Sequence, residues 1–343
     1  MKEMMNKYWS CTYEYDIFIR FYENKVYLTI PEFDVYDKEA IKSNVDKIKC
    51  EFCYNNLKYK STDMDNEKIT FSVTSNSNEK QQCLIFRPIY IAEYKRVSQK
   101  IDRRELLKVE YLNKRGWKES FSYEYTDIRL QKLREKCDVD SWIDKSSGIA
   151  TVQSILIWIS NNISHNGFTG LPVDQSAYKV LDFARQKENQ LNCKGLAIIA
   201  MELCLLMKLK VKLICCIQKE VNVIDSHYVI SVYIEELDKW IMADPSYCVI
   251  IYDSLGNPLS IPEIRRCLAT NKETYLSDNA NCGGKKLNKI LYLRSLIKKF
   301  YRFYTLIETK VNGDYEDNRI MLAPKNMEYP DLNCIDTPDD FWK

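Results

Sequence analysis

The sequence from residue 191 to residue 197 reads Leu-Asn-Cys-Lys-Gly-Leu-Ala, and an apolar run follows it. Apolar residues then recur at steps of three and four, which predicts a helix with one buried face. The positions of this apolar stripe are Leu196, Ile199, Ala200, Leu203 and Leu206. Asn192 is of a type that caps helix N-termini, so Cys193 is predicted at the first helical position. The free N–H groups and the positive end of the helix dipole favour a thiolate there.

A histidine and an aspartate follow this cysteine along the chain. The sequence contains two histidines, His165 and His227, and Asp244 comes shortly after the second. A nearby imidazole converts a thiol into a nucleophilic thiolate, and a carboxylate behind the imidazole fixes its tautomer and orientation. The ordered set Cys193, His227 and Asp244 therefore predicts a catalytic triad.

The segments around His227 and Asp244 read as strands. Strands are predicted over 211–217, 228–234 and 239–243, with a turn at 236–238 between the last two. That hairpin brings His227, which opens one strand, to the same end as Asp244, which closes the next. Whether both side chains share a face depends on the register, which the pattern leaves open.

These stretches resemble the transglutaminase-like superfamily, whose core is a papain-like cysteine-peptidase fold. The resemblance covers roughly residues 145–265. It implies that Cys193 is the nucleophile, His227 the base and Asp244 the orienting carboxylate. The step Asp244-Pro245-Ser246 is similar to the family's Asp-Pro-Thr/Ser step, and Trp240 fits the aromatic residue often found before it.

Two positions depart from the family pattern. Leu191 stands where the family often has glycine, and Val229 where it often has an aromatic residue. Neither position carries chemistry, but access to Cys193 is expected to differ.

The fold class predicted is α+β, with a central Cys-bearing helix packed on an antiparallel sheet. Two earlier helices are expected over 155–163 and 177–185. Residues 1–140 are predicted to form a β-rich accessory domain, with strands over 25–30, 68–73, 83–87 and 117–125. Residues 141–268 are expected to form the catalytic core. Residues 269–343 are expected to add a helical C-terminal extension, with one long helix over 287–308 and a surface-wrapping tail.

Several polar or aromatic residues are candidates for lining the site. Gln186, Asn189 and Gln190 precede the nucleophile and could donate to an oxyanion, although each could equally be an ordinary polar residue at a helix end. Asn192 and Trp240 are the other site-lining candidates. His165 lies in a polar, turn-like stretch, where an exposed loop position is favoured over a place in the site.

Composition excludes several functional classes. A net charge of +2 argues against nucleic acid as a partner. The absence of a long apolar run argues against a membrane span, and the first residues lack the apolar stretch of a signal peptide. Thirteen cysteines, an odd number, fit a reducing cytoplasm. Cys50 and Cys53 have the spacing of half a zinc site, but no second pair matches them, so neither a metal nor a cofactor is expected.

The function predicted is that of a cysteine peptidase or amidase, or of a protein-glutamine acyltransferase. The substrate would be a peptide or protein amide, attacked through an acyl-enzyme, with hydrolysis favoured over transamidation. The alternative is a catalytically silent transglutaminase-like protein that acts as a binding or scaffolding module.

Overall fold

The computed structural model of the chain describes seven strands within the first 101 residues, and residues 104–167, 169–219, 226–311, 319–325 and 333–343. Its contacts divide the chain into two compact units, Met1–Ile101 and Asp102–Lys343. The sequence predicted a boundary near residue 140, whereas the division lies between residues 101 and 102.

The first unit contains two antiparallel sheets. One has the strand order β1-β2-β3 and the other β4-β5-β6-β7. The strands are β1 (Tyr8–Ser10), β2 (Phe18–Tyr22), β3 (Lys25–Thr29), β4 (Glu51–Tyr54), β5 (Leu57–Met64), β6 (Ile69–Ser75) and β7 (Asn78–Phe86). Strands thus occur near residues 25, 69 and 83, where alternating sequence predicts them. The accessory role of this segment stays a prediction.

The second unit is built on an eight-stranded sheet, with the order β15-β14-β13-β12-β11-β18-β20-β21. Its strands are β11 (Val211–Ile217), β12 (Ser226–Ile234), β13 (Lys239–Asp244), β14 (Val249–Tyr252), β15 (Tyr275–Leu276), β18 (Arg302–Leu306), β20 (Arg319–Leu322) and β21 (Asn333–Ile335). All neighbours are antiparallel except β20 and β21. The three strands predicted over 211–243 are confirmed. The coarse class, α+β with helices on a mostly antiparallel sheet, is therefore also observed.

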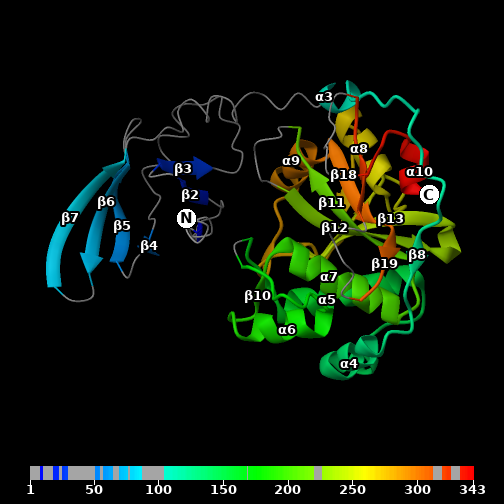
Figure 1. Cartoon of the computed structure of the whole chain (residues 1–343), viewed down its shortest axis with the longest axis horizontal. Helices are drawn as coiled ribbons and strands as arrows, with labels where there is room; N and C mark the ends of the chain where they lie inside the picture. Colours follow the sequence, from blue (N-terminus) through cyan, green and yellow to red (C-terminus); the bar gives the residue numbers. More distant parts are fainter. Residues whose placement is uncertain are drawn as a thin grey trace. The chain divides into compact units, whose positions relative to one another are not determined.

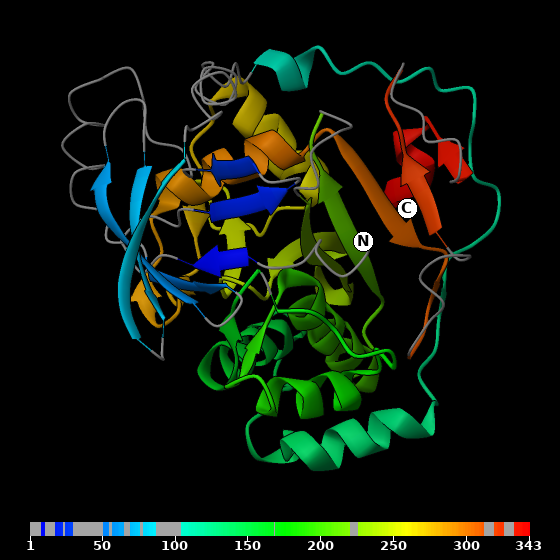
Figure 2. The same cartoon turned by 60° about the vertical axis from the view of Figure 1, so that its left-hand side comes forward.

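Helices cover this sheet. They are α3 (Arg104–Leu107), α4 (Ile128–Cys137), α5 (Gly148–Asn162), α6 (Ala177–Arg185), α7 (Cys193–Leu206), α8 (Ile261–Thr270), α9 (Lys289–Lys299) and α10 (Pro338–Trp342). Figures 1 and 2 show α4, α5, α6 and α7 gathered together, with α7 next to the sheet. α7 packs on β11 and β12, while α9 packs on β11 and against α8. The helices predicted upstream of Cys193 correspond to α5 and α6.

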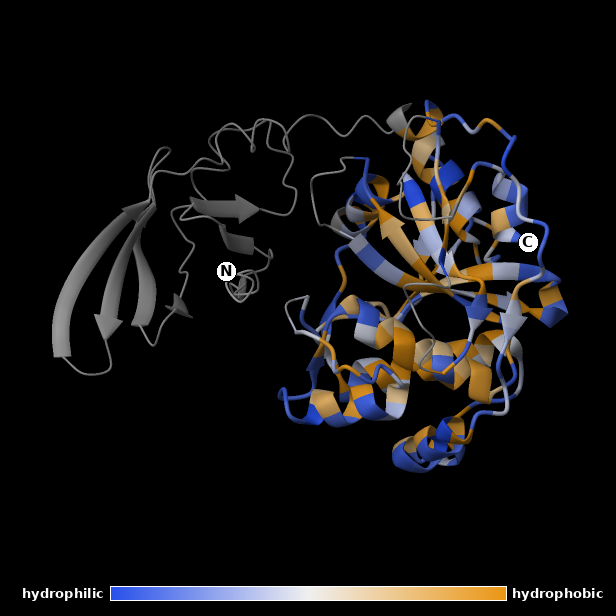
Figure 3. Cartoon of the chain, in the orientation of Figure 1, coloured by the Kyte–Doolittle hydropathy of each residue, from blue (hydrophilic) through white to orange (hydrophobic). Residues whose placement is uncertain are grey.

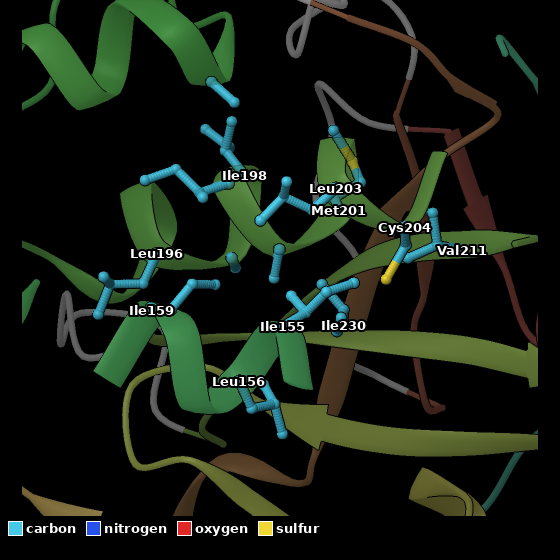
Figure 4. Packing of buried hydrophobic residues seen from close by; sticks show 14 of the residues in the cluster. Ile155, Leu156, Ile159, Leu196, Ile198, Met201, Leu203, Cys204, Val211 and Ile230 are labelled. Atoms are coloured by element: carbon cyan, nitrogen blue, oxygen red, sulfur yellow. The ribbon is translucent and has the colours of Figure 1, made fainter. Parts of the chain in front are cut away.

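The core of the second unit is centred on α7. Every residue from Gly195 to Leu205 is buried, Glu202 included, so the helix is buried on all sides and not on the one face that its apolar stripe predicts. Figure 4 shows Leu196 of α7 beside Ile159 of α5, and Ile155 of α5 beside Ile230 of β12, while Ile198 lies on the other side of α7. The outer helix α4 carries many hydrophilic residues by contrast (Figure 3). Among the described residues, no helix has both the length and the apolar character needed to cross a bilayer.

The C-terminal third differs from its prediction. One long helix was expected over residues 287–308, but α9 ends at Lys299 and residues 302–306 form β18, in the interior of the sheet. The long-helix prediction is therefore wrong. The cause is tertiary: β18 pairs with β11 on one side and β20 on the other, and an aromatic-rich segment fits a pleated, buried surface well. The expected tail likewise contributes β20 and β21 to the sheet.

Residues 102–140 belong to the second unit, and several contacts join the described part of this segment to it. β8 (Ser122–Tyr123) pairs with β19 (Glu308–Thr309), and α4 packs on α6 and α7. Of the strand predicted over 117–125, only residues 122–123 are in a strand. Two smaller ladders complete the unit: β9 (Ser164–His165) with β10 (Gln190–Leu191), and β16 (Asn281–Cys282) with β17 (Lys285–Lys286).

A buried lysine connects β11 to α10. The Lys212 side chain is 1% exposed, and its Nζ donates to the carbonyl oxygens of Phe341 at 3.1 Å and Lys343 at 2.5 Å. The same ammonium lies 3.5 Å from the ring centre of Phe121 and 4.8 Å from that of Trp240. Lys212 therefore holds two segments against the sheet, the end of the chain at residues 341–343 and the stretch around Phe121.

Replacing Lys212 with alanine is expected to lower the free energy of unfolding by about 2–4 kcal/mol, because packing and two buried hydrogen bonds are lost together. Chemical denaturation followed by circular dichroism measures this difference. Lys210→Ala is the matched control, because Lys210 is exposed and contacts a single ring, that of Tyr233. Its cost should stay below about 1 kcal/mol. Equal denaturation midpoints for the two variants would contradict the role given to Lys212.

Candidate active site

Cys193 is the first residue of α7, as the sequence predicts. The Asn192 side chain caps the helix by accepting from the backbone N–H of Gly195 at 2.9 Å. Its amide nitrogen donates to the carbonyl of Thr169 at 2.7 Å, which fixes the preceding loop against the helix start. The first N–H groups of a helix have no acceptor within the helix. Cys193, which is half-buried, therefore lies at a positive, hydrogen-bond-donating helix end.

The β12–β13 register brings His227 and Asp244 together. Ile230 pairs with Ala243, so the next pair along the ladder is Val229 with Asp244. Side chains two residues apart on a strand share a face, so His227 lies diagonally across from Asp244. The His227 Nε2 and Asp244 Oδ2 atoms are 2.7 Å apart. The register of the β12–β13 hairpin therefore places His227 and Asp244 on the same face, where they form a histidine–carboxylate pair.

Both oxygens of the Asp244 carboxylate have further donors. Asp244 is fully buried. Its Oδ1 accepts from the backbone N–H of Ser246 at 3.0 Å, and its Oδ2 accepts from the hydroxyl of Tyr292 at 2.8 Å. Burial raises the pKa of Asp244, but the His227 charge and these hydrogen bonds more than compensate and lower it. A buried carboxylate held in this way stays ionised and orients the imidazole.

His165, the other histidine of the chain, also lies close to the Cys193 thiol. His165 is in β9, which pairs in parallel with β10 immediately before the α7 start, so that His165 lies opposite Leu191. The imidazoles of His165 and His227 both lie close enough to Cys193 to lower the pKa of its thiol. The sequence favoured an exposed loop for His165, whereas the structure places it half-buried beside the thiol.

One aromatic ring contacts both histidines. The Tyr247 ring centre is 5.5 Å from that of His165 and 5.8 Å from that of His227. It also meets the ring of Tyr292 edge-on at 5.4 Å. Tyr247 and Tyr292 were not among the predicted site residues. Tyr247, three residues after Asp244, could have been suspected from its position, but Tyr292 comes from α9 and carries no local signal.

The thiol and the His227 imidazole have shifted pKa values of opposite sense. Burial raises the pKa of Cys193, but hydrogen bonds from His165 and His227 and the positive charge of the imidazoles outweigh burial and lower the pKa to about 5. Burial lowers the pKa of His227, yet the charge and hydrogen bond of Asp244, with smaller contributions from Cys193, raise it to about 10. The pair is therefore a thiolate and an imidazolium across the neutral range.

Other described cysteines have the opposite shift. Burial raises the pKa of Cys137 and Cys215 to about 12 and that of Cys248 to about 11. These thiols stay protonated near neutral pH and behave as small apolar side chains. Cys193 is thus set apart from them by its electrostatic environment.

The remaining candidates lie at the edges of the site or away from it. The Gln190 side-chain oxygen accepts from the Asn166 amide at 2.6 Å. Gln186 and Asn189 are exposed, the former ending α6. Trp240 is the second residue of β13, four residues and therefore about 13 Å along the strand from Asp244. Its ring contacts Tyr233 and the ammonium of Lys212 instead.

No metal-binding cluster is found in the part of the chain that the structure describes, where no three His, Cys, Asp or Glu residues are grouped suitably. Of the two cysteines with zinc-like spacing, Cys50 lies outside the described residues, and the side chain of Cys53 does as well.

The hydroxyl of Tyr292 offers a direct test of the carboxylate's role. Tyr292→Phe removes one donor from Asp244, and we expect the rate of the reaction at Cys193 to fall about tenfold, as for the loss of one hydrogen bond to a charged group. Steady-state kinetics measures the change. Tyr275→Phe, at an exposed tyrosine of β15, is the control. A Tyr292→Phe variant as active as Tyr275→Phe would show that this hydrogen bond does not matter for catalysis.

Comparison with known proteins finds no matching family model and no matching curated protein. Among solved structures, a proposed cysteine protease from Cytophaga hutchinsonii is 20% identical with a TM-score of 0.28, over 34% of this chain and 37% of that one. A protein described as a TGase is 14% identical with a TM-score of 0.24, over 56% of this chain and 45% of that one.

The transglutaminase of red sea bream is 10% identical with a TM-score of 0.23, over 52% of this chain and 37% of that one. The chain therefore spans less than half the length of each of these three proteins.

Proposed function

We propose that the protein is a thiol enzyme with a transglutaminase-like core that cleaves or transfers the acyl group of a peptide or protein amide. The observation that carries this proposal is the Cys193 thiol at the start of α7, whose pKa is lowered by a His227 imidazole that is paired at 2.7 Å with the buried Asp244. Helix start, strand start and strand end supply the three residues in that order. This arrangement supports nucleophilic catalysis.

In the proposed reaction the Cys193 sulfur attacks the amide carbonyl. The new C–S bond forms as the carbonyl π electrons move to oxygen, and backbone N–H groups at the α7 start are placed to stabilise that oxyanion. When the intermediate collapses, the C–N bond breaks and His227 gives its proton to the departing amine. Asp244 stays ionised throughout and holds the His227 ring in place.

The acyl-enzyme then reacts with a second substrate. His227, now neutral, takes a proton from water or from an amine, and the attack of that oxygen or nitrogen releases Cys193. Water makes the protein a peptidase or amidase, and an amine makes it a transamidase. We favour hydrolysis and propose no cofactor, because the residues named above supply every proton transfer.

The pH dependence of iodoacetamide labelling at each cysteine, read by mass spectrometry, tests the proposal. Cys193 should label half-maximally near pH 5, while Cys137, Cys215 and Cys248 stay unlabelled below about pH 7, since an ordinary free thiol titrates near 8.5. His227→Ala should move the Cys193 titration upward. An unreactive Cys193 in the folded protein would contradict the enzyme proposal and favour a binding module.

Product analysis separates hydrolysis from transfer. The protein is incubated with a peptide anilide alone, and then with a fluorescent primary amine and a glutamine-rich protein. Release of the aniline from the peptide anilide, without incorporation of the fluorescent amine, supports hydrolysis. Amine incorporation that depends on Cys193 would show transfer instead. Both reactions pass through the same acyl-enzyme, so they differ only in whether water or an amine reacts with it as the second substrate.

A further inference from the structure

We infer that His165 is a second catalytic residue, which stabilises the negative charge first on the Cys193 sulfur and then on the oxyanion formed from the substrate. This inference rests on the proposed function and divides the work between the two histidines. His227 moves protons, and His165 binds the anion.

The two imidazoles differ in the groups that hold them in place. His227 has the buried Asp244 at 2.7 Å, an arrangement that suits proton transfer. His165 is held instead through its backbone, because Ser164 and Asn166 on either side donate to the carbonyls of Asn189 at 2.8 Å and Leu191 at 2.7 Å. Its ring packs edge-on against Tyr247. A ring fixed in this way, with no ion pair to a carboxylate within the described residues, is suited to donate rather than to shuttle a proton.

The position of His165 relative to the nucleophile follows from the β9–β10 ladder. Leu191, its partner in that ladder, is two residues before Cys193, so His165 approaches the thiol from the loop side while His227 approaches from the sheet side. His165 lies close enough to Cys193 to lower the pKa of the thiol. Cys193 on α7 and Tyr247 after β13 are the titratable groups near its ring.

One nitrogen of this ring is left without a bonding partner. The Nε2 atom of His165 is buried and makes no hydrogen bond within the described part of the chain. A buried polar nitrogen without a partner is costly, so a group that satisfies it binds favourably. The carbonyl oxygen of a substrate attacked by Cys193 becomes anionic close to this ring, and it is the partner we assign to the imidazole.

When Cys193 attacks the substrate carbonyl, only the position of the negative charge changes. As the C–S bond forms, negative charge leaves the sulfur and arrives on the carbonyl oxygen, and a donor that follows it needs to move neither a proton nor an electron. When the intermediate collapses, the C=O bond re-forms and the donor is released. His165 therefore contributes to both the resting thiolate and the transition state, whereas His227 acts when the C–N bond breaks.

The decisive experiment is a double-mutant cycle on the Cys193 titration, measured by iodoacetamide labelling of the full chain. The variants are His165→Leu, His227→Ala and their combination, with Ser164→Ala as the matched control. Ser164 is exposed and lies on the same strand as His165, but its side chain points to the opposite face. Circular dichroism and the unfolding midpoint establish that each variant is folded.

We expect His165→Leu to raise the pKa of Cys193 by about two units, and so to lower labelling at pH 6 by about tenfold. His227→Ala alone should leave Cys193 more acidic than an ordinary thiol, because His165 remains, and only the double variant should titrate at or above about 8.5. His165→Gln, which keeps an N–H donor at this position, should retain more of the acylation rate than His165→Leu.

The possible results separate the two proposals. A wild-type Cys193 that titrates as an ordinary thiol overturns the thiol-enzyme proposal itself. A wild-type Cys193 that is acidic, together with a folded His165→Leu variant that titrates like wild type, overturns the role of His165 alone. If His165→Gln and His165→Leu acylate equally slowly, His165 holds the thiolate but does not bind the oxyanion, and that half of the inference fails.

Discussion

Replacing Cys193 with serine is expected to lower the rate of amide cleavage or transfer by about a thousandfold or more. A serine hydroxyl is far less acidic than a thiol, and it would face an imidazole that Asp244 keeps protonated, so no base is available to activate it. Single-turnover kinetics with the peptide anilide measures the loss. The variant should fold normally, because oxygen for sulfur at a half-buried helix start changes little volume.

Cys267→Ser is the control for this substitution. Cys267 is half-buried on α8, and burial raises the pKa of its thiol. Its conversion to serine should leave the rate within about twofold of wild type, in line with a thiol that takes no part in the reaction. If Cys193→Ser and Cys267→Ser retained the same activity, the nucleophile would have to be sought elsewhere.

Replacing Asp244 with asparagine is expected to lower the rate by about 10³–10⁴-fold, the effect typical of losing the carboxylate behind a catalytic histidine. The amide oxygen of asparagine can still accept from the backbone N–H of Ser246, with the NH2 group taking the place of the oxygen that faces Tyr292 and His227, so the local fold should survive. Without the negative charge, however, the pKa of His227 falls from its raised value of about 10 and the imidazolium that stabilises the thiolate is lost. Labelling of Cys193 should then shift toward higher pH along with the fall in rate.

Asp253→Asn is the matched control for this second prediction. Asp253 is half-buried, in the turn after β14, and its carboxylate caps that turn by accepting from the backbone N–H groups of Leu255 and Asn257. The substitution removes one negative charge from the same unit without touching His227. A full loss of activity in both variants would indicate a general effect of charge or folding rather than a specific role of Asp244.

Much of this site could be predicted because its signals are local. Asn192 before an apolar periodic run marks a helix start, and the run of β-branched and aromatic residues after His227 marks a strand. The hairpin turn then limits which residue pairs with which. These short-range rules place Cys193, His227 and Asp244 on the correct elements without knowledge of the rest of the chain.

The parts that could not be predicted depend on distant segments. His165 reaches Cys193 only because β9 pairs with β10, and no periodicity marks two-residue strands. The sequence of residues 302–306 is compatible with either a helix or a strand, and pairing with β11 and β20 on either side stabilises the strand. Tyr292 contacts Asp244 because α9 packs across the sheet at that point. Long-range packing overrides local propensity in all three cases.

The burial of α7 has a consequence for how the protein loses activity. A helix whose residues are buried from Gly195 to Leu205 opens to solvent only when the whole unit unfolds, so its backbone amides should exchange hydrogen at the rate of global unfolding. Cys193, the proposed nucleophile, is attached to the start of this protected helix. Denaturant should therefore leave catalysis intact until the cooperative transition, with inactivation and loss of structure following a single curve.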